Sequence, residues 1–238
     1  MKQTVNLAGL IVDNVTLVEA VAKVEGFIAS GQPHLVATPN PEMIVTAQDD
    51  QELRDILNKA DLRIPDGISM VVVSRILGTP LQERVSGIDL MLKLCEVSAV
   101  KGYKIFLLGS APAVPEEAAK KLTALFPGLK VVGTQHGYFG GDDPAVLKKI
   151  MHTEPDLLFC GLGASRQEKW LNHHLAELKT VGMVIGGSLD VISGRKKRAP
   201  KWAQALYIEW LYRLFSEPQR WKRQLALPKF LWLVFTRR

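Results

Sequence analysis

Lys104-Ile105-Phe106-Leu107-Leu108-Gly109 is the stretch that decides the fold of this chain. A short apolar run ends in a glycine turn, and the apolar residues that follow recur at helical spacing over Val114–Leu125. Further strands are expected at Lys130–Gly133, Asp156–Cys160 and Val181–Ile185. Strands that alternate with helices at this spacing predict a Rossmann-like α/β fold, in which helices cover both faces of a parallel sheet.

The N-terminal part of the chain has the same organisation. Short strands are expected at His34–Thr38 and Leu62–Pro65. Glycines, prolines and small polar residues mark the points where helices begin and end. With these signals, helices are expected at residues 16–30, 42–48, 51–59, 67–77, 87–100, 144–151 and 166–178, in addition to 114–125.

Length and composition limit the class of protein. The chain has 238 residues, 47% of them apolar, which is enough for one good core with an appendage. Its first residues lack the apolar run of a signal peptide, and no stretch reaches the ~20 apolar residues of a spanning helix. Cys95 and Cys160 fit neither a metal site nor a disulfide framework, so buried free thiols in a reducing compartment are expected.

Charge divides the chain at residue 195. Residues 195–238 hold twelve Lys or Arg and two acids, a net charge of +10, whereas residues 1–194 hold 18 basic and 22 acidic residues, a net charge of −4. Nine of the 17 aromatic residues also lie in the C-terminal part. We therefore expect an α/β core over residues 1–194 and a basic, aromatic-rich appendage over residues 195–238. One appendage helix is expected from Pro200 to Ser216, and another from Pro218.

A basic segment rich in tryptophan is typical of proteins that bind a polyanionic surface, either a membrane or nucleic acid. The long apolar run at Leu225–Phe235 favours lipid. The sequence therefore predicts a helical appendage that associates with an anionic membrane surface, and no nucleic-acid partner. Because the same surface is uncovered away from the membrane, a homo-oligomer in solution is a further expectation.

Small polar residues and glycines gather where the expected strands end, at Thr38-Pro39-Asn40, Pro65-Asp66-Gly67, Gly161-Leu162-Gly163 and Gly186-Gly187-Ser188. In open α/β sheets, ligands bind beyond the carboxyl ends of the strands, where glycines let backbone N–H groups approach a phosphate. Asp66 is the sharpest candidate, because a carboxylate at a strand end suits a general base. The alternative is that Asp66 caps the helix that follows it, and the pattern alone does not separate the two roles.

Several common kinds of site have no matching motif. Gly161-Leu162-Gly163 lacks the third glycine of a dinucleotide fingerprint, and neither a P-loop nor a nucleophile elbow is present. Asp142-Asp143 follows two glycines and precedes Pro144, which favours a solvated turn and a helix cap over a metal site. From pattern alone, Gln167-Glu168-Lys169-Trp170 fits an ordinary exposed helix surface. Neither a metal nor another cofactor is expected.

Many short segments along nearly the whole chain carry one resemblance. They are Ala37–Glu42, Ile64–Gly67, Glu83–Leu90, Phe106–Gly109, His136–Phe139, Gly161–Ala164, Gln167–Trp170, Gly186–Val191, Lys197–Pro200, Glu209–Leu214 and Glu217–Arg223. Together and in this order, these segments resemble the WecG/TagA/CpsF glycosyltransferase family. Each segment alone is weak, but the resemblance is specific because so many of them match together.

The resemblance implies an inverting, metal-independent hexosyltransferase that moves N-acetylmannosamine from its UDP donor to undecaprenyl-diphosphate-linked N-acetylglucosamine. The most similar subgroup acts in linkage-unit synthesis for wall teichoic acid. Such an enzyme is expected in the cytoplasm, peripheral on the inner face of the cell membrane. Other donors, such as the uronate of UDP-N-acetylmannosamine or UDP-glucose, stay open. The alternative from another class is a non-catalytic protein that binds nucleotide sugars or nucleic acid.

Matched position by position, the resemblance makes Asp66 the base that deprotonates the acceptor hydroxyl. Arginine suits a diphosphate because its planar guanidinium binds two oxygens at once. The other expected roles are Thr38 and Asn40 at the sugars, Arg84 and Gln167 at the donor diphosphate, Gly187 and Asp190 near the nucleoside, and Arg213, Arg220 and Arg223 at the lipid diphosphate.

Overall fold

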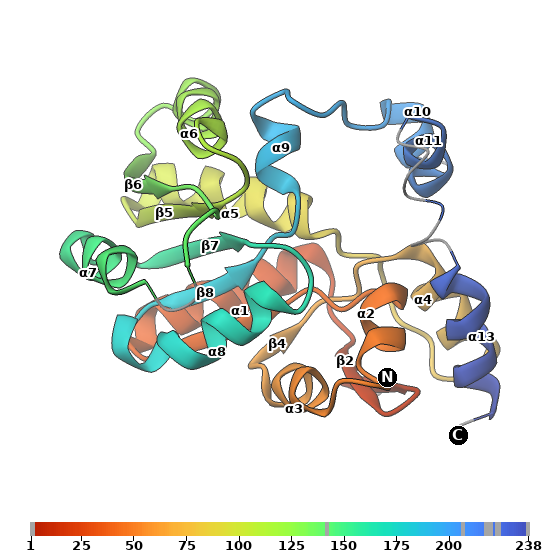
Figure 1. Ribbon diagram of the computed structural model, residues 1–238. Coiled ribbons are helices and arrows are strands. Elements are labelled where there is room, and N and C mark those ends of the chain that lie inside the picture. The colour runs from red at the N-terminus through yellow and green to blue at the C-terminus, as the bar shows by residue number, and fades with distance from the viewer. Residues whose placement is uncertain (1–2, 141–142, 206–207, 217–220, 222–224, 237–238) are drawn as a thin grey trace.

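The computed structural model describes residues 3–140, 143–205, 208–216, 221 and 225–236. Its centre is a sheet in which six of the described strands run parallel, in the order β4-β3-β8-β7-β5-β6 (Figure 1). The Rossmann-like α/β prediction is confirmed. The strands are β3 (His34–Ala37), β4 (Leu62–Arg63), β5 (Lys104–Gly109), β6 (Lys130–Gln135), β7 (Leu157–Gly161) and β8 (Val181–Val184).

Helices cover both faces of the sheet because successive strand residues point to opposite sides. Ile105 and Leu107 of β5 join one core cluster, whereas Phe106 and Leu108 join the other. The first cluster lies under α1 (Leu17–Ser30), α5 (Gly87–Lys101), α6 (Val114–Leu125) and α9 (Ser188–Ile192). The second lies under α2 (Pro41–Thr46), α3 (Gln51–Lys59), α4 (Ile68–Ile76), α7 (Pro144–Thr153) and α8 (Arg166–Leu178).

An N-terminal hairpin was not predicted. Thr4–Leu7 (β1) pairs antiparallel with Leu10–Asp13 (β2) across a turn at Ala8-Gly9, whose φ angles are positive. The Asp13 carboxylate accepts hydrogen bonds from Arg63 Nε at 2.9 Å and from the Arg63 backbone N–H at 2.7 Å. Because Arg63 lies in β4, this pair fastens the hairpin beside the edge strand of the main sheet.

The C-terminal segment forms several helices beyond the carboxyl edge of the sheet (Figure 1). The single helix predicted from Pro200 to Ser216 is wrong, because α10 (Lys201–Ala205) and α11 (Glu209–Ser216) are separate and Ile208 is not helical. The Ile208 N–H bonds to the Ala203 carbonyl, five residues back, which closes a wider turn than the α-helical one. The helix expected to begin at Pro218 lies outside the described residues.

The last helix, α13 (Ala226–Thr236), packs against α2. Phe230, Leu233 and Val234 are buried and belong to the same core cluster as α2 and α8. Pro228 fits inside this helix because the N–H groups of a first turn have no helical partner to lose. Within the described part of the chain, no helix has the length and apolar character needed to cross a membrane.

Both cysteines are buried free thiols, as predicted. Burial raises the pKa of the Cys95 thiol to about 12. Burial also raises the pKa of the Cys160 thiol well above its usual value. Neither side chain is therefore ionised or accessible in the folded chain.

Candidate active site

A cavity of about 790 Å³ opens at the carboxyl ends of the strands, a size that suits a small-molecule ligand. It is lined by the turns that follow β3, β4, β5, β7 and β8, and by residues of α11 and α13 from the C-terminal segment. The structure therefore brings together one group of predicted residues from distant parts of the sequence: Thr38, Asn40, Asp66, Arg84, Gln167, Gly187 and Asp190.

The floor of the cavity lies over glycines that allow the ends of β5, β7 and β8 to approach closely, and Gly161 and Gly186 among them line the cavity. A Cβ at Gly109 would lie 2.2 Å from the carbonyl oxygen of Gly161. A Cβ at Gly161 would in turn lie 2.5 Å from the carbonyl oxygen of Gly186. These are backbone clashes that side-chain movement cannot relieve, and Gly109 has in addition a φ of 130°.

We expect Gly109→Ala to distort the floor of the cavity. The added methyl group pushes the ends of β5 and β7 apart and imposes a strained φ, so thermal unfolding should shift down by several degrees and UDP binding should weaken. The matched control is Gly26→Ala in α1, where an added Cβ meets no atom within 4 Å. If Gly109→Ala has the same unfolding midpoint and the same UDP affinity as the control, the close approach of the strands is not required for stability or for UDP binding.

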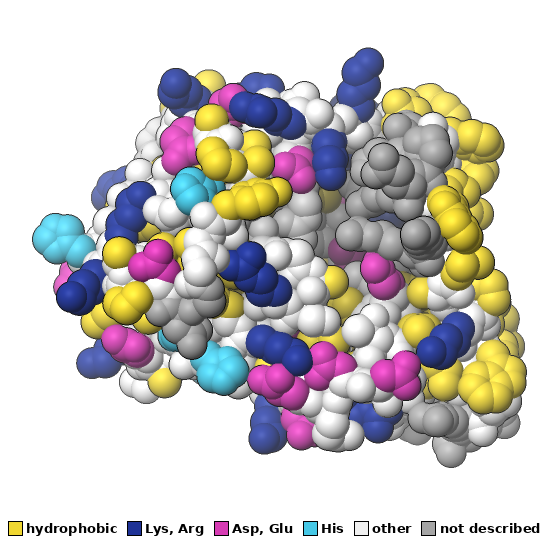
Figure 2. Space-filling model, viewed as in Figure 1, with side chains coloured by type: hydrophobic (Ala, Val, Ile, Leu, Met, Phe, Trp, Pro, Cys, Tyr) yellow, Lys and Arg dark blue, Asp and Glu magenta, His cyan; other side chains and the backbone are white. Residues whose placement is uncertain are grey.

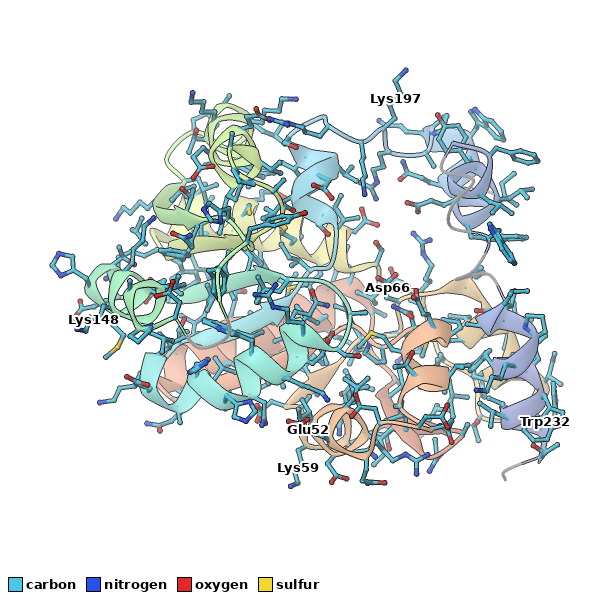
Figure 3. All side chains as sticks on the ribbon, in the orientation of Figure 1. Glu52, Lys59, Asp66, Lys148, Lys197 and Trp232 are labelled. Carbon is cyan, nitrogen blue, oxygen red and sulfur yellow. The ribbon has the colours of Figure 1, made fainter. Side chains whose placement is uncertain are left out.

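Asp66 lies just after β4 and faces the cavity near the centre of the molecule (Figure 3). Its backbone N–H bonds to the carbonyl of Pro39, which joins the turns after β3 and β4. Its Oδ2 accepts the N–H of Gly87 at 3.3 Å, at the first residue of α5. The N-cap of the helix that follows Asp66 is Gly67, and no side chain bonds there. The structure thus places Asp66 at the start of α5, where the helix dipole stabilises its negative charge.

Thr38 and Asn40 form the wall beside Asp66. Thr38 is buried, and its methyl group lies 3.3 Å from the position that a Cβ on Gly87 would take. Asn40 is the N-cap of α2, since its Oδ1 accepts the backbone N–H of Met43 at 3.0 Å. This bond uses the oxygen of the Asn40 amide, so the NH₂ group of the same side chain is the part suited to a ligand.

Arg84 connects the core with the C-terminal segment. Its Nη1 lies 3.4 Å from Glu209 Oε2 in α11, and its Nη2 lies 3.9 Å from Asp89 Oδ2 in α5. Asp89 also pairs with Arg198. Two cations and two carboxylates therefore alternate across the boundary between residues 1–194 and 195–238. Glu209 was not predicted as a site residue, because its partner Arg84 lies 125 positions away along the chain.

Gln167 and Glu168 are buried, so the interpretation of residues 167–170 as an exposed helix surface is wrong. Trp170 is buried as well, while Lys169 reaches Asp50 at 2.9 Å. Gln167 Oε1 accepts the backbone N–H of Gly186 at 3.1 Å, and its Nε2 donates to Glu168 Oε1 at 2.8 Å. Burial raises the pKa of the Glu168 carboxyl above its usual value, and the Gln167 hydrogen bond offsets part of that rise.

Gly187 and Asp190 lie at the start of α9, where the turn after β8 meets the cavity. A Cβ on Gly187 would stand 3.6 Å from Asp190 Oδ2. Lys196 Nζ lies 3.5 Å from the same carboxylate oxygen, which puts a cation beside Asp190. Lys196 was not predicted as a site residue, although it lines the cavity.

Comparison with known proteins decides the family. The sequence profile of the "Glycosyl transferase WecG/TagA/CpsF family" matches residues 5–238. A relative in Bacillus subtilis (strain 168) is 38% identical over 198 residues, which are 82% of this chain and 77% of the relative. A relative in Staphylococcus aureus (strain MW2) is 34% identical over 233 residues, 97% of this chain and 91% of the relative. Both relatives are named N-acetylglucosaminyldiphosphoundecaprenol N-acetyl-beta-D-mannosaminyltransferase.

The chain belongs to the WecG/TagA/CpsF family of glycosyltransferases. This confirms the resemblance found in the sequence. The family match spans the cavity and the C-terminal segment alike, since it continues from residue 5 to residue 238.

Three arginines are assigned to a lipid diphosphate by the family resemblance, and the structure describes none of their side chains. Arg213 lies in α11, but its side chain is outside the description. Arg220 and Arg223 lie outside the described residues. Their roles stay predictions.

The acidic pair predicted to form a turn and a cap is described in part. Asp143 Oδ1 accepts the N–H of Ala145 at 2.9 Å and caps α7, as predicted, while Asp142 lies outside the described residues. In the part of the chain that the structure describes, no group of three or more His, Cys, Asp or Glu side chains could hold a metal ion.

Proposed function

We propose that this chain transfers N-acetylmannosamine from UDP-N-acetylmannosamine to undecaprenyl-diphosphate-linked N-acetylglucosamine. The observation that carries the proposal is the convergence of seven predicted site residues on one cavity, in a chain whose relatives are named for this reaction. Wall teichoic acid or a related surface glycan is the proposed destination of the product. The rival donors are the uronate of UDP-N-acetylmannosamine and UDP-glucose.

In the proposed mechanism, Asp66 takes the proton of the acceptor hydroxyl as the oxygen attacks the anomeric carbon of the donor. The new bond forms between the acceptor oxygen and that carbon. The bond from the carbon to the donor diphosphate breaks, and UDP leaves with the electron pair. Attack opposite the leaving group inverts the configuration at the anomeric carbon. Thr38 and the Asn40 amide orient the sugars beside Asp66.

Cationic side chains are proposed to stabilise the departing diphosphate without a metal ion. Arg84 and Lys196 line the cavity, and both now pair with carboxylates of the protein itself. A diphosphate that binds Arg84 must replace Glu209 as its partner or share the guanidinium with it. Donor binding is therefore coupled to the position of α11, which carries Glu209.

We also propose that the C-terminal segment holds the protein on the inner face of the cell membrane. Hydrophobic side chains gather along the edge formed by α11 and α13 (Figure 2). On α13, Trp232 projects outward (Figure 3) and is 61% exposed, and Phe235 is 44% exposed. Arg213, Arg220 and Arg223 are proposed to bind the lipid diphosphate there. Away from the membrane, the same apolar edge favours self-association.

Replacing Trp232 and Phe235 together by Ser is expected to weaken binding to anionic vesicles by about 10-fold or more. Each large apolar side chain contributes roughly 1.5–3 kcal/mol when fully buried, and partial insertion contributes a fraction of that. Co-sedimentation with phosphatidylglycerol vesicles measures the effect. Val100→Ser is the control, because Val100 is 85% exposed at the C-terminal end of α5, next to the start of β5. Equal binding by both proteins would remove α13 from the membrane contact.

The function itself is tested with a panel of UDP sugars and a soluble lipid-diphosphate N-acetylglucosamine analogue, with the product identified by mass spectrometry. Transfer from UDP-N-acetylmannosamine, with inversion, is the expected result. Transfer only from another UDP sugar would identify that sugar nucleotide as the donor in place of UDP-N-acetylmannosamine. No transfer from any donor, together with salt-dependent RNA binding, would favour the non-catalytic alternative.

A further inference from the structure

Two adjacent side chains at the start of α8 reach from the core of the protein to the wall of the cavity. Gln167 is 3% exposed and Glu168 is 0% exposed. Glu168 Oε1 accepts a hydrogen bond from Gln167 Nε2, and Gln167 Oε1 accepts one from the backbone N–H of Gly186. The chain of contacts therefore runs from Glu168 through Gln167 to the turn after β8.

Only one orientation of the Gln167 amide satisfies both of its hydrogen bonds. The Gly186 N–H is a donor and needs the amide oxygen, so the NH₂ group must point the other way. Glu168 supplies an acceptor on that side. Without it, the amide can rotate, and a rotated amide would bring NH₂ against N–H and leave the Gly186 N–H unsatisfied.

The turn fixed in this way is a tight one. Gly186 has a φ of 52°. Its carbonyl oxygen packs so close to Gly161 that a Cβ added there would lie only 2.5 Å from it. Gly186, Gly187 and Ser188 all line the cavity. A small rotation of the Gln167 amide therefore moves backbone groups that face the cavity. Glu168 itself does not line the cavity, so its effect on the ligand is indirect.

We propose that Glu168 is a positioning residue of the cavity: it fixes the Gln167 amide and, through it, the Gly186-Gly187 turn that contacts the donor. The identity of the donor rests on the proposed function, whereas the contacts from Glu168 to the turn do not. The requirement is for a hydrogen-bond acceptor at position 168. A negative charge is not required, because Gln167 Nε2 is neutral.

The charge state of Glu168 agrees with this role. The Glu168 carboxyl is buried, and the Gln167 side chain and the backbone N–H groups of Glu168 and Ser165 offset only part of the cost of burying its charge. Burial raises the pKa of the carboxyl, so the protonated form is favoured relative to a solvated Glu. A proton on Oε2 leaves Oε1 free to accept from Gln167. Glutamine at position 168 has the same shape as this neutral acid.

The test compares Glu168→Gln and Glu168→Met in the full-length protein. Glu168→Gln keeps a carbonyl acceptor and should retain the wild-type KM for the donor. Glu168→Met keeps the volume and removes the acceptor, so the KM should rise about three- to tenfold while kcat changes less, as expected for lost ground-state binding. Hydrogen exchange of the peptide spanning residues 185–188 should be faster in Glu168→Met alone.

Leu171→Ala is the control for a general loss of stability. Leu171 is buried in the same helix and contacts β8 near Gly182, away from the turn. It should unfold at lower temperature with an unchanged donor KM. Glu168→Gln with the same defect as Glu168→Met would overturn the proposal, and so would Glu168→Met with wild-type KM and exchange.

Gln167→Met provides a second measurement if Glu168→Met folds poorly. Because the two residues act in series, Gln167→Met should raise the donor KM at least as much. Adding Glu168→Leu, which also removes the acceptor, should then change the KM no further. Additive effects would contradict a shared route. If the wild type transfers no sugar at all, the proposed function fails, but hydrogen exchange at residues 185–188 still tests the contact from Glu168.

The pH dependence of the unfolding midpoint tests the burial of the Glu168 carboxyl, separately from the kinetic measurements. A carboxyl whose pKa is higher in the folded than in the unfolded state binds more protons when folded, so its contribution to stability is full below the unfolded pKa and is lost as pH rises through the folded one. For Glu168 this window starts at the ordinary pKa of a glutamate and extends upward, because burial raises the pKa of the carboxyl in the folded chain. Glu168→Gln should flatten the decline of the unfolding midpoint in this window, whereas an unchanged slope would contradict a buried carboxyl with a raised pKa.

Discussion

We expect Asp66→Asn to lower the rate of sugar transfer by about 10²–10⁴-fold, the usual contribution of a general base, without a comparable loss of stability. The amide cannot take the proton of the acceptor hydroxyl. Its oxygen can still accept the N–H of Gly87, so the start of α5 keeps its partner. The rate is measured under single-turnover conditions with the soluble acceptor analogue, and folding is followed by thermal unfolding.

Asp55→Asn is the matched control, because it makes the same chemical change on the exposed surface of α3. It should leave the transfer rate and the donor affinity unchanged. A rate close to wild type in Asp66→Asn would remove Asp66 from the role of base. If UDP binding fell as steeply as the rate, Asp66 would have to be assigned to donor binding instead.

Phe230→Ala is expected to destabilise the whole protein by about 3–5 kcal/mol, the usual cost of truncating a fully buried phenylalanine. Phe230 is 0% exposed, and it lies in α13 within the same core cluster as α2 and α8. The lost transfer energy and the cavity left behind both add to the cost. For a chain of this size, the midpoint of thermal unfolding should fall on the order of 10 °C.

Phe235→Ala on the same helix is the comparison, since Phe235 is 44% exposed and should change the midpoint little. A single unfolding transition that shifts in Phe230→Ala would show that residues 195–238 do not fold as an energetically separate appendage. A separate early transition for the C-terminal helices, with the main transition unmoved, would support the predicted division at residue 195.

The repeated strand–helix pattern was enough to predict the parallel sheet. The bounds of α3, α6 and α8 agree with the prediction, because caps and apolar periodicity are local signals. The hairpin at Thr4–Asp13 was missed, although its strands flank Ala8-Gly9, a turn signal. The break at Ile208 was missed because no proline or glycine marks it.

The site was predictable where chemistry follows a strand. Asp66 and Gly187 sit at strand ends that a parallel sheet must bring to one edge. The pairing of Arg84 with Glu209 depends on how α11 folds back, which no local pattern encodes. The burial of Glu168 was missed for a similar reason: a charged residue on a helix is normally exposed, and only the packing of α8 against the turn after β8 buries it.

Because both native thiols are buried, the folded protein should not react with cysteine-labelling reagents. Cys95 and Cys160 are inaccessible and resist ionisation, so alkylating reagents at neutral pH should leave them unmodified. A cysteine introduced at an exposed position of α13 would then be the reactive one. An environment-sensitive fluorophore placed there would report the polarity around this helix when vesicles are added, with both native thiols retained.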